Sequence, residues 1–119
     1  RDTKLIDNNT HEAWLKAVLS DPDRVLLIGE YQGNAVGVAR FDICADEAEV
    51  SIYLAPDHKG EGFGSDLLLA AEQWLCEHRP AVLSVRAEVL NNNEASHRLF
   101  QACGYQLRCS LYAKDVHRI

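Results

Sequence analysis

Three glycines stand immediately before a helical pattern, an arrangement suited to binding an anion. They are Gly60, Gly62 and Gly64, and Lys59 precedes the first of them. The first N–H groups of a helix have no partner within the helix, and the helix dipole is positive at that end. Glycines remove the side chains that would hold a phosphate away from these N–H groups, and Lys59 adds a positive charge. The pattern predicts a phosphate-binding turn, although a tight strand-to-helix connection would use the same glycines.

Two better-known phosphate-binding motifs match this turn poorly. No Lys-Ser/Thr pair follows the last glycine, as the P-loop requires. The glycines are spaced G-x-G-x-G, and no alternating strand and helix pattern precedes them, as a dinucleotide-binding fold requires. Binding of ATP or NAD therefore remains an alternative to be tested.

The residues around the turn predict a strand before it and an amphipathic helix after it. Val50, Ile52 and Leu54 alternate with polar or amphipathic residues, which is typical of a half-buried strand at 48–54. Apolar residues then recur at helical spacing over 64–78, and Pro80 ends the helix. The turn is thereby placed at the junction of a central strand and a helix.

The rest of the chain predicts a helix–strand pattern in the order α-β-β-β-α-β-α-β. The first three strands should form an antiparallel meander, and the strand after the long helix should lie parallel to the central strand. The further expected elements are helices at 11–19 and 94–103 and strands at 25–31, 35–43, 81–90 and 105–114.

Composition agrees with one small enzyme domain over residues 1–119. The chain is 47% hydrophobic and 25% charged, and no apolar run is long enough to span a bilayer. The formal net charge of −6 argues against a nucleic-acid surface. Cys44, Cys76, Cys103 and Cys109 form no C-x-x-C pair, so we expect reduced, mostly buried thiols in the cytoplasm and no metal site.

Two segments resemble the signatures of the GCN5-related N-acetyltransferase (GNAT) superfamily. Residues 59–64, KGEGFG, resemble the Q/R-x-x-G-x-G/A signature, with Lys59 in place of Arg or Gln. Residues 93–100, followed by Gly104-Tyr105, resemble the second signature, N-x-x-A/S-x-x-L-Y and then G-F. Two signatures in the expected order are more specific than either alone, and the resemblance covers the chain from about residue 11 to the end.

The resemblance implies an α+β fold, a mixed and mostly antiparallel twisted sheet flanked by helices. A full domain of this superfamily has another strand and usually another helix at its front. The chain is therefore expected to lack the first strand and part of the first helix. The strand at 25–31 would then be a free sheet edge, through which a homodimer is expected to form.

The resemblance also implies acetyl-CoA as cofactor and transfer of its acetyl group to a primary amine by direct attack in a ternary complex. The central strand should separate from the strand at 81–90, which frees backbone groups for the pantetheine arm. A backbone N–H near Tyr53 or Leu54 would stabilise the oxyanion. The residues expected to bind the cofactor are Ile52, Tyr53, Leu54, Lys59, Gly60, Glu61, Gly62, Phe63, Gly64, Ser65, Asn93 and Ser96.

Glu88 and Glu49 are the expected catalytic bases, because an attacking amine must be neutral. Glu88 precedes Phe100 by the spacing that some family members have between base and acid, and Glu49 lies on the central strand. Either glutamate alone would also suit a solvated sheet face. Phe100 departs from the family, which commonly has a tyrosine acid there. A thiol of pKa about 8.5 leaves fairly well unaided.

The acceptor is the least constrained part of the hypothesis. Trp14 and Arg40 lie in segments that resemble GNAT enzymes of pseudaminic-acid-type pathways, which act on nucleotide-linked amino sugars. Core packing for Trp14 and ion pairing for Arg40 are the simpler interpretations. The alternatives are acetylation of a protein N-terminus or a cationic small molecule, or a non-catalytic acyl-CoA-binding module.

Overall fold

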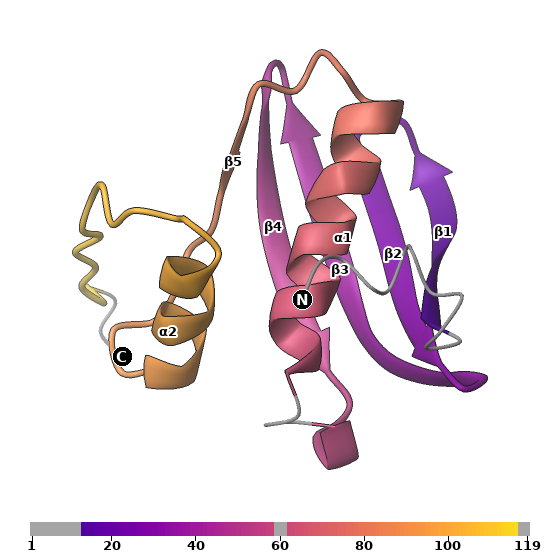
Figure 1. Ribbon diagram of the computed structural model, residues 1–119. Coiled ribbons are helices and arrows are strands. Elements are labelled where there is room, and N and C mark those ends of the chain that lie inside the picture. Colours follow the sequence, from indigo (N-terminus) through magenta and orange to yellow (C-terminus); the bar gives the residue numbers. More distant parts are fainter. Residues whose placement is uncertain (1–12, 59–61, 117–119) are drawn as a thin grey trace.

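The computed structural model describes residues 13–58 and 62–116 and contains one five-stranded sheet with two helices (Figure 1). The strands lie in chain order, β1-β2-β3-β4-β5; the first four are antiparallel, and β5 is parallel to β4. This confirms the predicted fold class. The elements are β1 (Ala13–Asp21), β2 (Arg24–Tyr31), β3 (Asn34–Cys44), β4 (Glu47–Leu54), the short 3-10 helix η1 (Pro56–His58), α1 (Phe63–His78), β5 (Ser84–Arg86) and α2 (Glu94–Ala102).

Helix α1 covers one face of the sheet, and the hydrophobic core lies between them. Its side chains at Leu67, Leu68, Ala71 and Leu75 recur at helical spacing and are buried. Each fully buried leucine contributes roughly 1.5–3 kcal/mol. The sheet supplies the alternate residues of β2, β3 and β4 to this core: Val25, Leu27, Ala39, Phe41, Ala48 and Val50. The core therefore fixes α1 across the middle of the sheet.

Residues 13–21 form strand β1, so the expected helix at 11–19 is wrong. Asp21 Oδ1 accepts a hydrogen bond of 2.8 Å from the N–H of Asp23, in a turn that returns the chain beside β2. Pairing with β1 satisfies the backbone hydrogen bonds of β2. This gain outweighs any preference of residues 13–21 for a helix, because helix propensities differ by less than about 1 kcal/mol per residue. Strand β2 is consequently internal, and the predicted free edge at 25–31 is wrong: within the described part of the chain, β1 and β5 are the edge strands.

The C-terminal segment also differs from expectation. Residues 105–116 form neither helix nor strand, so the predicted strand at 105–114 is wrong. The predicted strand at 81–90 is confirmed only for Ser84–Arg86. An alternating sequence forms a strand only where a neighbouring strand supplies hydrogen bonds. Residues 105–116 have no such neighbour among the described residues.

The four cysteines are free thiols, as expected, but they are not mostly buried. Cys44, Cys76 and Cys109 are exposed, and Cys103 is half-buried. The exposed ones lie at the end of β3, on α1 and in the C-terminal segment, and they do not belong to the hydrophobic core.

We expect Gly37→Ala to destabilise the sheet. A Cβ at Gly37 would lie 2.7 Å from the carbonyl oxygen of Tyr53 and 3.0 Å from Cδ2 of Leu67. The carbonyl cannot move without disturbing the β3–β4 ladder, so the free energy of unfolding should fall by about 1–3 kcal/mol in urea titrations. Ala35→Ser, at an exposed position of the same strand, should change it by less than about 0.5 kcal/mol.

Candidate functional site

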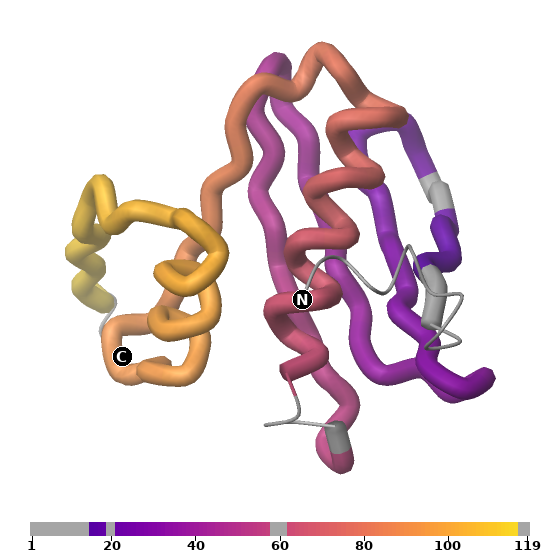
Figure 2. Tube along the Cα trace, viewed as in Figure 1, coloured from indigo at the N-terminus to yellow at the C-terminus, as the bar shows by residue number. Residues whose placement is uncertain are grey.

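Strands β4 and β5 pair for only three residues and then separate. Glu47 pairs with Ser84 and Glu49 with Arg86, and no further pair follows. Figure 2 shows the chain after β5 diverging from β4. The predicted separation of these strands is therefore confirmed, and it leaves the second half of β4 without a neighbour on this side among the described residues.

The backbone groups that face the split can be identified from the β3–β4 ladder. The N–H of Ala55 donates to the carbonyl of Val36 over 2.9 Å, and Tyr53 is paired with Val38. Because backbone direction alternates along a strand, Tyr53 and Ala55 bond to β3, whereas the N–H and C=O groups of Ile52 and Leu54 face the split. Leu54 thus presents its N–H to the gap, and Tyr53 does not.

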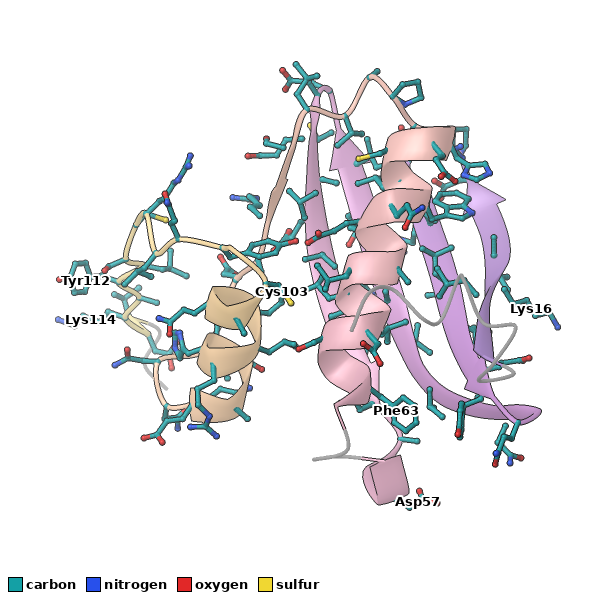
Figure 3. All side chains as sticks on the ribbon, viewed as in Figure 1. Lys16, Asp57, Phe63, Cys103, Tyr112 and Lys114 are labelled. Atoms are coloured by element: carbon teal, nitrogen blue, oxygen red, sulfur yellow. The ribbon has the colours of Figure 1, made fainter. Side chains whose placement is uncertain are left out.

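The split opens beside the N-terminus of α1, where the glycine turn ends. Gly62 caps the helix with φ of 82°, and Phe63, labelled in Figure 3, is buried with its ring 5.4 Å from that of Tyr31. The first intrahelical hydrogen bond of α1 runs from Asp66 to Gly62, and the amides of Gly64 and Ser65 lie ahead of it, where an anion could bind. Lys59, Gly60 and Glu61 lie outside the described residues.

Gly64 has a packing role besides the one predicted. A Cβ at this position would lie 3.4 Å from Cδ1 of Leu99 on α2 and 3.5 Å from Cδ1 of Leu54 on β4. The missing side chain therefore lets α1, α2 and β4 approach one another at the end of the split.

A groove of about 890 Å³ lies between residues 82–89, α1 and the segment after α2, and it includes Glu47 and Glu49 of β4 but not Ile52, Leu54 or residues 62–65. Several carboxylates line it. Both predicted bases, Glu49 and Glu88, lie in its wall together with Glu47 and Glu72. The guanidinium of Arg86 lies 3.6 Å from Glu47 and 3.7 Å from Glu49. Glu88 makes no ion pair within residues 13–58 and 62–116, so its carboxylate is the freer of the two.

A half-buried contact between Glu72 and Tyr105 was not foreseen. The Tyr105 hydroxyl donates a hydrogen bond of 2.5 Å to Oε2 of Glu72, and its ring packs edge-on against Phe100 at 5.0 Å. Burial raises the pKa of Glu72, partly offset by this hydrogen bond. Burial, and then the bond to Glu72, raise the pKa of Tyr105 well above its ordinary value. The only sequence signal was a carboxylate between Leu68 and Leu75 on the apolar face of α1.

The Tyr105 hydroxyl should affect stability and its dependence on pH. Since the folded-state pKa is raised, the contribution of Tyr105 is fully present below its unfolded value of 10.0 and is lost as the pH rises above that value. Tyr105→Phe should cost about 1–3 kcal/mol near neutral pH, because Glu72 loses its donor, and should flatten the alkaline loss. Tyr112→Phe, at a 94% exposed side chain, should do neither in urea titrations at several pH values.

The start of α2 contains the two predicted cofactor contacts of the second signature. The side chain of Asn93 caps the helix by accepting a hydrogen bond of 3.1 Å from the N–H of Ser96. This cap explains Asn93 on structural grounds, and its contact with a cofactor stays a prediction.

The predicted acceptor residues do not join this groove. Arg40 Nε lies 3.2 Å from Oδ2 of Asp42 on β3, and Arg40 is absent from the groove lining. The side chain of Trp14 lies outside the described part of the structure. Tyr53 projects its side chain outward, 57% exposed.

The described residues contain neither a membrane-spanning helix nor a cluster of metal ligands. Neither helix has the length and hydropathy that crossing a bilayer requires. No group of three or more His, Cys, Asp or Glu side chains there is placed to hold a metal ion.

A comparison with protein families decides the membership of the chain. The model of the "Acetyltransferase (GNAT) family" matches residues 2–105. The chain belongs to the GNAT acetyltransferase family. Among curated proteins, none matches it significantly. As a GNAT protein it is an acyltransferase, and the family uses acetyl-CoA.

Solved acetyltransferase structures share the GNAT fold. AAC(6')-Iy, in complex with the bisubstrate analogue CoA-S-monomethyl-acetylneamine, has a TM-score of 0.66 and 20% identity over 82% of this chain and 74% of its own. AAC(6')-Ih from Acinetobacter baumannii, an aminoglycoside 6'-N-acetyltransferase, has a TM-score of 0.61 and 18% identity over 82% and 74%. The spermidine N-acetyltransferase of Vibrio cholerae, in complex with CoA and spermine, has a TM-score of 0.65 and 24% identity over 71% and 52%. At these identities the likeness concerns the fold, and this chain spans about half of the spermidine enzyme.

The described residues of this GNAT domain fit the cofactor in two respects. The backbone of Ile52 and Leu54 is free on the side of the split, where an extended amide-bearing chain could bond to it. The amides of Gly64 and Ser65, at the positive end of a 16-residue helix, suit a pyrophosphate.

Proposed function

We propose that this GNAT domain transfers an acetyl group from acetyl-CoA directly to the primary amine of a cationic small molecule held in the same complex. The observation that carries the proposal is the split between β4 and β5, which opens at one end onto the N-terminus of α1 and is flanked by carboxylates. A catalytic site for this reaction needs a place for the thioester, a place for the amine and a base between them. The split would hold the thioester, and the groove contains candidates for the amine site and the base.

The cofactor would be held mainly by backbone groups. The amides of Gly62, Phe63, Gly64 and Ser65 would bind the pyrophosphate, with Lys59, Gly60 and Glu61 completing the turn. Ile52 and Leu54 would bond to the pantetheine arm, and Asn93 and Ser96 would contact it from α2. When bound, acetyl-CoA supplies the activated acetyl thioester.

Two groups of this chain would then act on the reaction. Glu88 would accept the proton of the attacking amine, directly or through a water, because its carboxylate is free of the ion pair that holds Glu49. The N–H of Leu54 would donate to the acetyl oxygen as negative charge develops there. We choose Leu54 over Tyr53 because the backbone of Tyr53 is directed to β3. Phe100 cannot protonate the leaving thiolate, and the hydroxyl of Tyr105 is directed to Glu72.

A cationic acceptor is favoured by the charge of the groove. Its lining contains the carboxylates of Glu47, Glu49, Glu72 and Glu88, and the chain as a whole has a net charge of −6. The spermidine and aminoglycoside acetyltransferases of the same fold are named for amine substrates. An amino sugar linked to a nucleotide would bring phosphates to these carboxylates, and Arg40 is engaged by Asp42. We therefore place that acceptor second. The free thiols suit the cytoplasm, where we place the reaction.

Two successive measurements test the proposal. Acetyl-CoA and desulfo-CoA should raise the melting temperature of the protein, whereas ATP and NAD should not. Spermidine, an aminoglycoside, a peptide with a free N-terminus and a nucleotide-linked amino sugar are then offered with acetyl-CoA, and release of free thiol is followed. Turnover with spermidine or the aminoglycoside supports the proposal. Stabilisation without turnover of any amine would instead indicate an acyl-CoA-binding module, and stabilisation by ATP or NAD alone would refute the cofactor assignment.

A further inference from the structure

Arg86 is the last paired residue of the β4–β5 ladder and lies where the two strands separate. It is paired with Glu49, and no pair follows. Its guanidinium is well exposed: Nε lies 3.6 Å from Oε1 of Glu47, and Nη2 lies 3.7 Å from Oε1 of Glu49. Within residues 13–58 and 62–116, these two glutamates form salt bridges with Arg86 alone. One guanidinium is therefore shared by two carboxylates at the mouth of the split.

The carboxylate next to Glu49 on β3 has arginines of its own. Asp42 is paired with Glu49 across the β3–β4 ladder, so two like charges lie side by side. Nε of Arg24 donates a hydrogen bond of 2.8 Å to Oδ1 of Asp42, and Nε of Arg40 lies 3.2 Å from its Oδ2. Arg86 is thus the group that compensates the charge of Glu49. Without it, Glu49 would lie beside another carboxylate with no cation of its own.

Glu49 and Glu88 lie at the same mouth but in different surroundings. Glu88 follows Arg86 by two residues, and both side chains are exposed while Val85 and Ala87 between and before them are half-buried. This alternation places Arg86 and Glu88 on one face of the stretch. Both glutamates line the groove. A carboxylate beside a guanidinium is the weaker base of two, because the guanidinium stabilises its charged form.

We propose that Arg86 is a positioning residue that withholds Glu49 from proton transfer and leaves that role to Glu88. The inference rests on the proposed acetyl transfer to an amine. In that transfer the amine nitrogen bonds to the acetyl carbon, and the carbon–sulfur bond breaks with its electron pair left on sulfur. A glutamate carboxylate takes the amine proton and passes it to the solvent. Removal of the guanidinium would free Glu49 to do the same from the other side of the split.

Carboxyl labelling tests the first half of the inference and does not depend on acetyl transfer. Glycine ethyl ester is coupled to the carboxyl groups with a carbodiimide, and the modification of Glu49 is followed by mass spectrometry of peptides. Arg86→Met should speed the labelling of Glu49 by at least about threefold, because the guanidinium no longer holds the carboxylate in its charged form. The matched control is Arg98→Met. Nη1 of Arg98 lies 3.7 Å from Oε1 of Glu94 on α2, so this change also removes one exposed arginine from an ion pair, but outside the groove.

Rescue of a variant that lacks Glu88 tests the second half. Glu88→Gln combined with Arg86→Met should regain at least about tenfold of the kcat that Glu88→Gln alone loses, because Glu49 becomes available as the base. Adding Glu49→Gln should abolish the gain. Arg86→Lys keeps a cation beside Glu49, and Arg98→Met leaves Arg86 in place, so neither should give a gain in the Glu88→Gln background. A purely structural role of Arg86 would instead make the double variant less active than Glu88→Gln.

The possible failures can be told apart. Unchanged labelling of Glu49 in Arg86→Met would overturn the inference, and so would a wild type that turns over an amine without any gain from the added Arg86→Met. Both results leave the proposed function standing. A wild type that turns over no amine would refute the proposed function and the proton transfer with it.

Discussion

Replacing Glu88 by glutamine should lower kcat by about 10²–10⁴-fold while leaving the affinity for acetyl-CoA unchanged. Glutamine keeps the size of the side chain but cannot accept the proton of the amine. The groove contains a second carboxylate, but Glu49 lies 3.7 Å from the guanidinium of Arg86, and its replacement should have the smaller effect. The measurements are thiol release at saturating acetyl-CoA and the melting temperature with acetyl-CoA.

The matched control for this experiment is Glu77→Gln. Glu77 is an exposed residue of α1 that does not line the groove, and its replacement makes the same change in net charge. It should leave kcat within about twofold of the wild-type value, as surface substitutions usually do. Full turnover by both Glu88→Gln and Glu49→Gln would show that neither glutamate is the base.

Replacing Gly62 by valine should weaken the binding of acetyl-CoA by about 10–100-fold, the loss expected when one or two hydrogen bonds to a charged phosphate are lost. Gly62 has φ of 82°, a left-handed conformation that a β-branched residue strongly disfavours. A shift of this cap would displace the first amides of α1 from the positions where they meet the pyrophosphate.

Gly33 offers a control with the same backbone strain. It too has φ of 82°, and a Cβ would find nothing within 4 Å at either glycine. Gly33→Val strains the turn between β2 and β3, which contributes no amide to the N-terminus of α1. Both variants should lose stability without ligand, but only Gly62→Val should lose its stabilisation by acetyl-CoA in a thermal-shift titration. Equal stabilisation of both would refute the phosphate assignment of the turn.

Several parts of the fold could be predicted because local interactions produce them. Helix α1 follows from its apolar spacing, the glycine before it and Pro80 after it, and it was expected at 64–78 and found at Phe63–His78. Helix α2 follows from the cap at Asn93, and Gly104 after it has a left-handed φ of 92°. The parallel β4–β5 pair follows from the handedness of connections through a helix.

Other parts depended on partners distant in sequence. Residues 13–21 suit either a helix or a strand, since Leu15, Ala17 and Leu19 also alternate, and the unpaired edge of β2 decided between them. The hydrogen bond between Glu72 and Tyr105 joins residues 33 positions apart, so no local sequence pattern predicts it. The ion pair of Arg86 with Glu49, which distinguishes Glu88 as the freer base, arises only when β4 and β5 lie side by side.

The sequence by itself determined the family of this protein, the turn before α1 and both candidate bases, because short motifs and local spacing are enough to specify them. Only the tertiary structure decided which strands are edges, which amides face the split and which glutamate is free of an ion pair. Those properties depend on hydrogen bonds and charges brought together from separate segments, and a chain has them only after its sheet has formed.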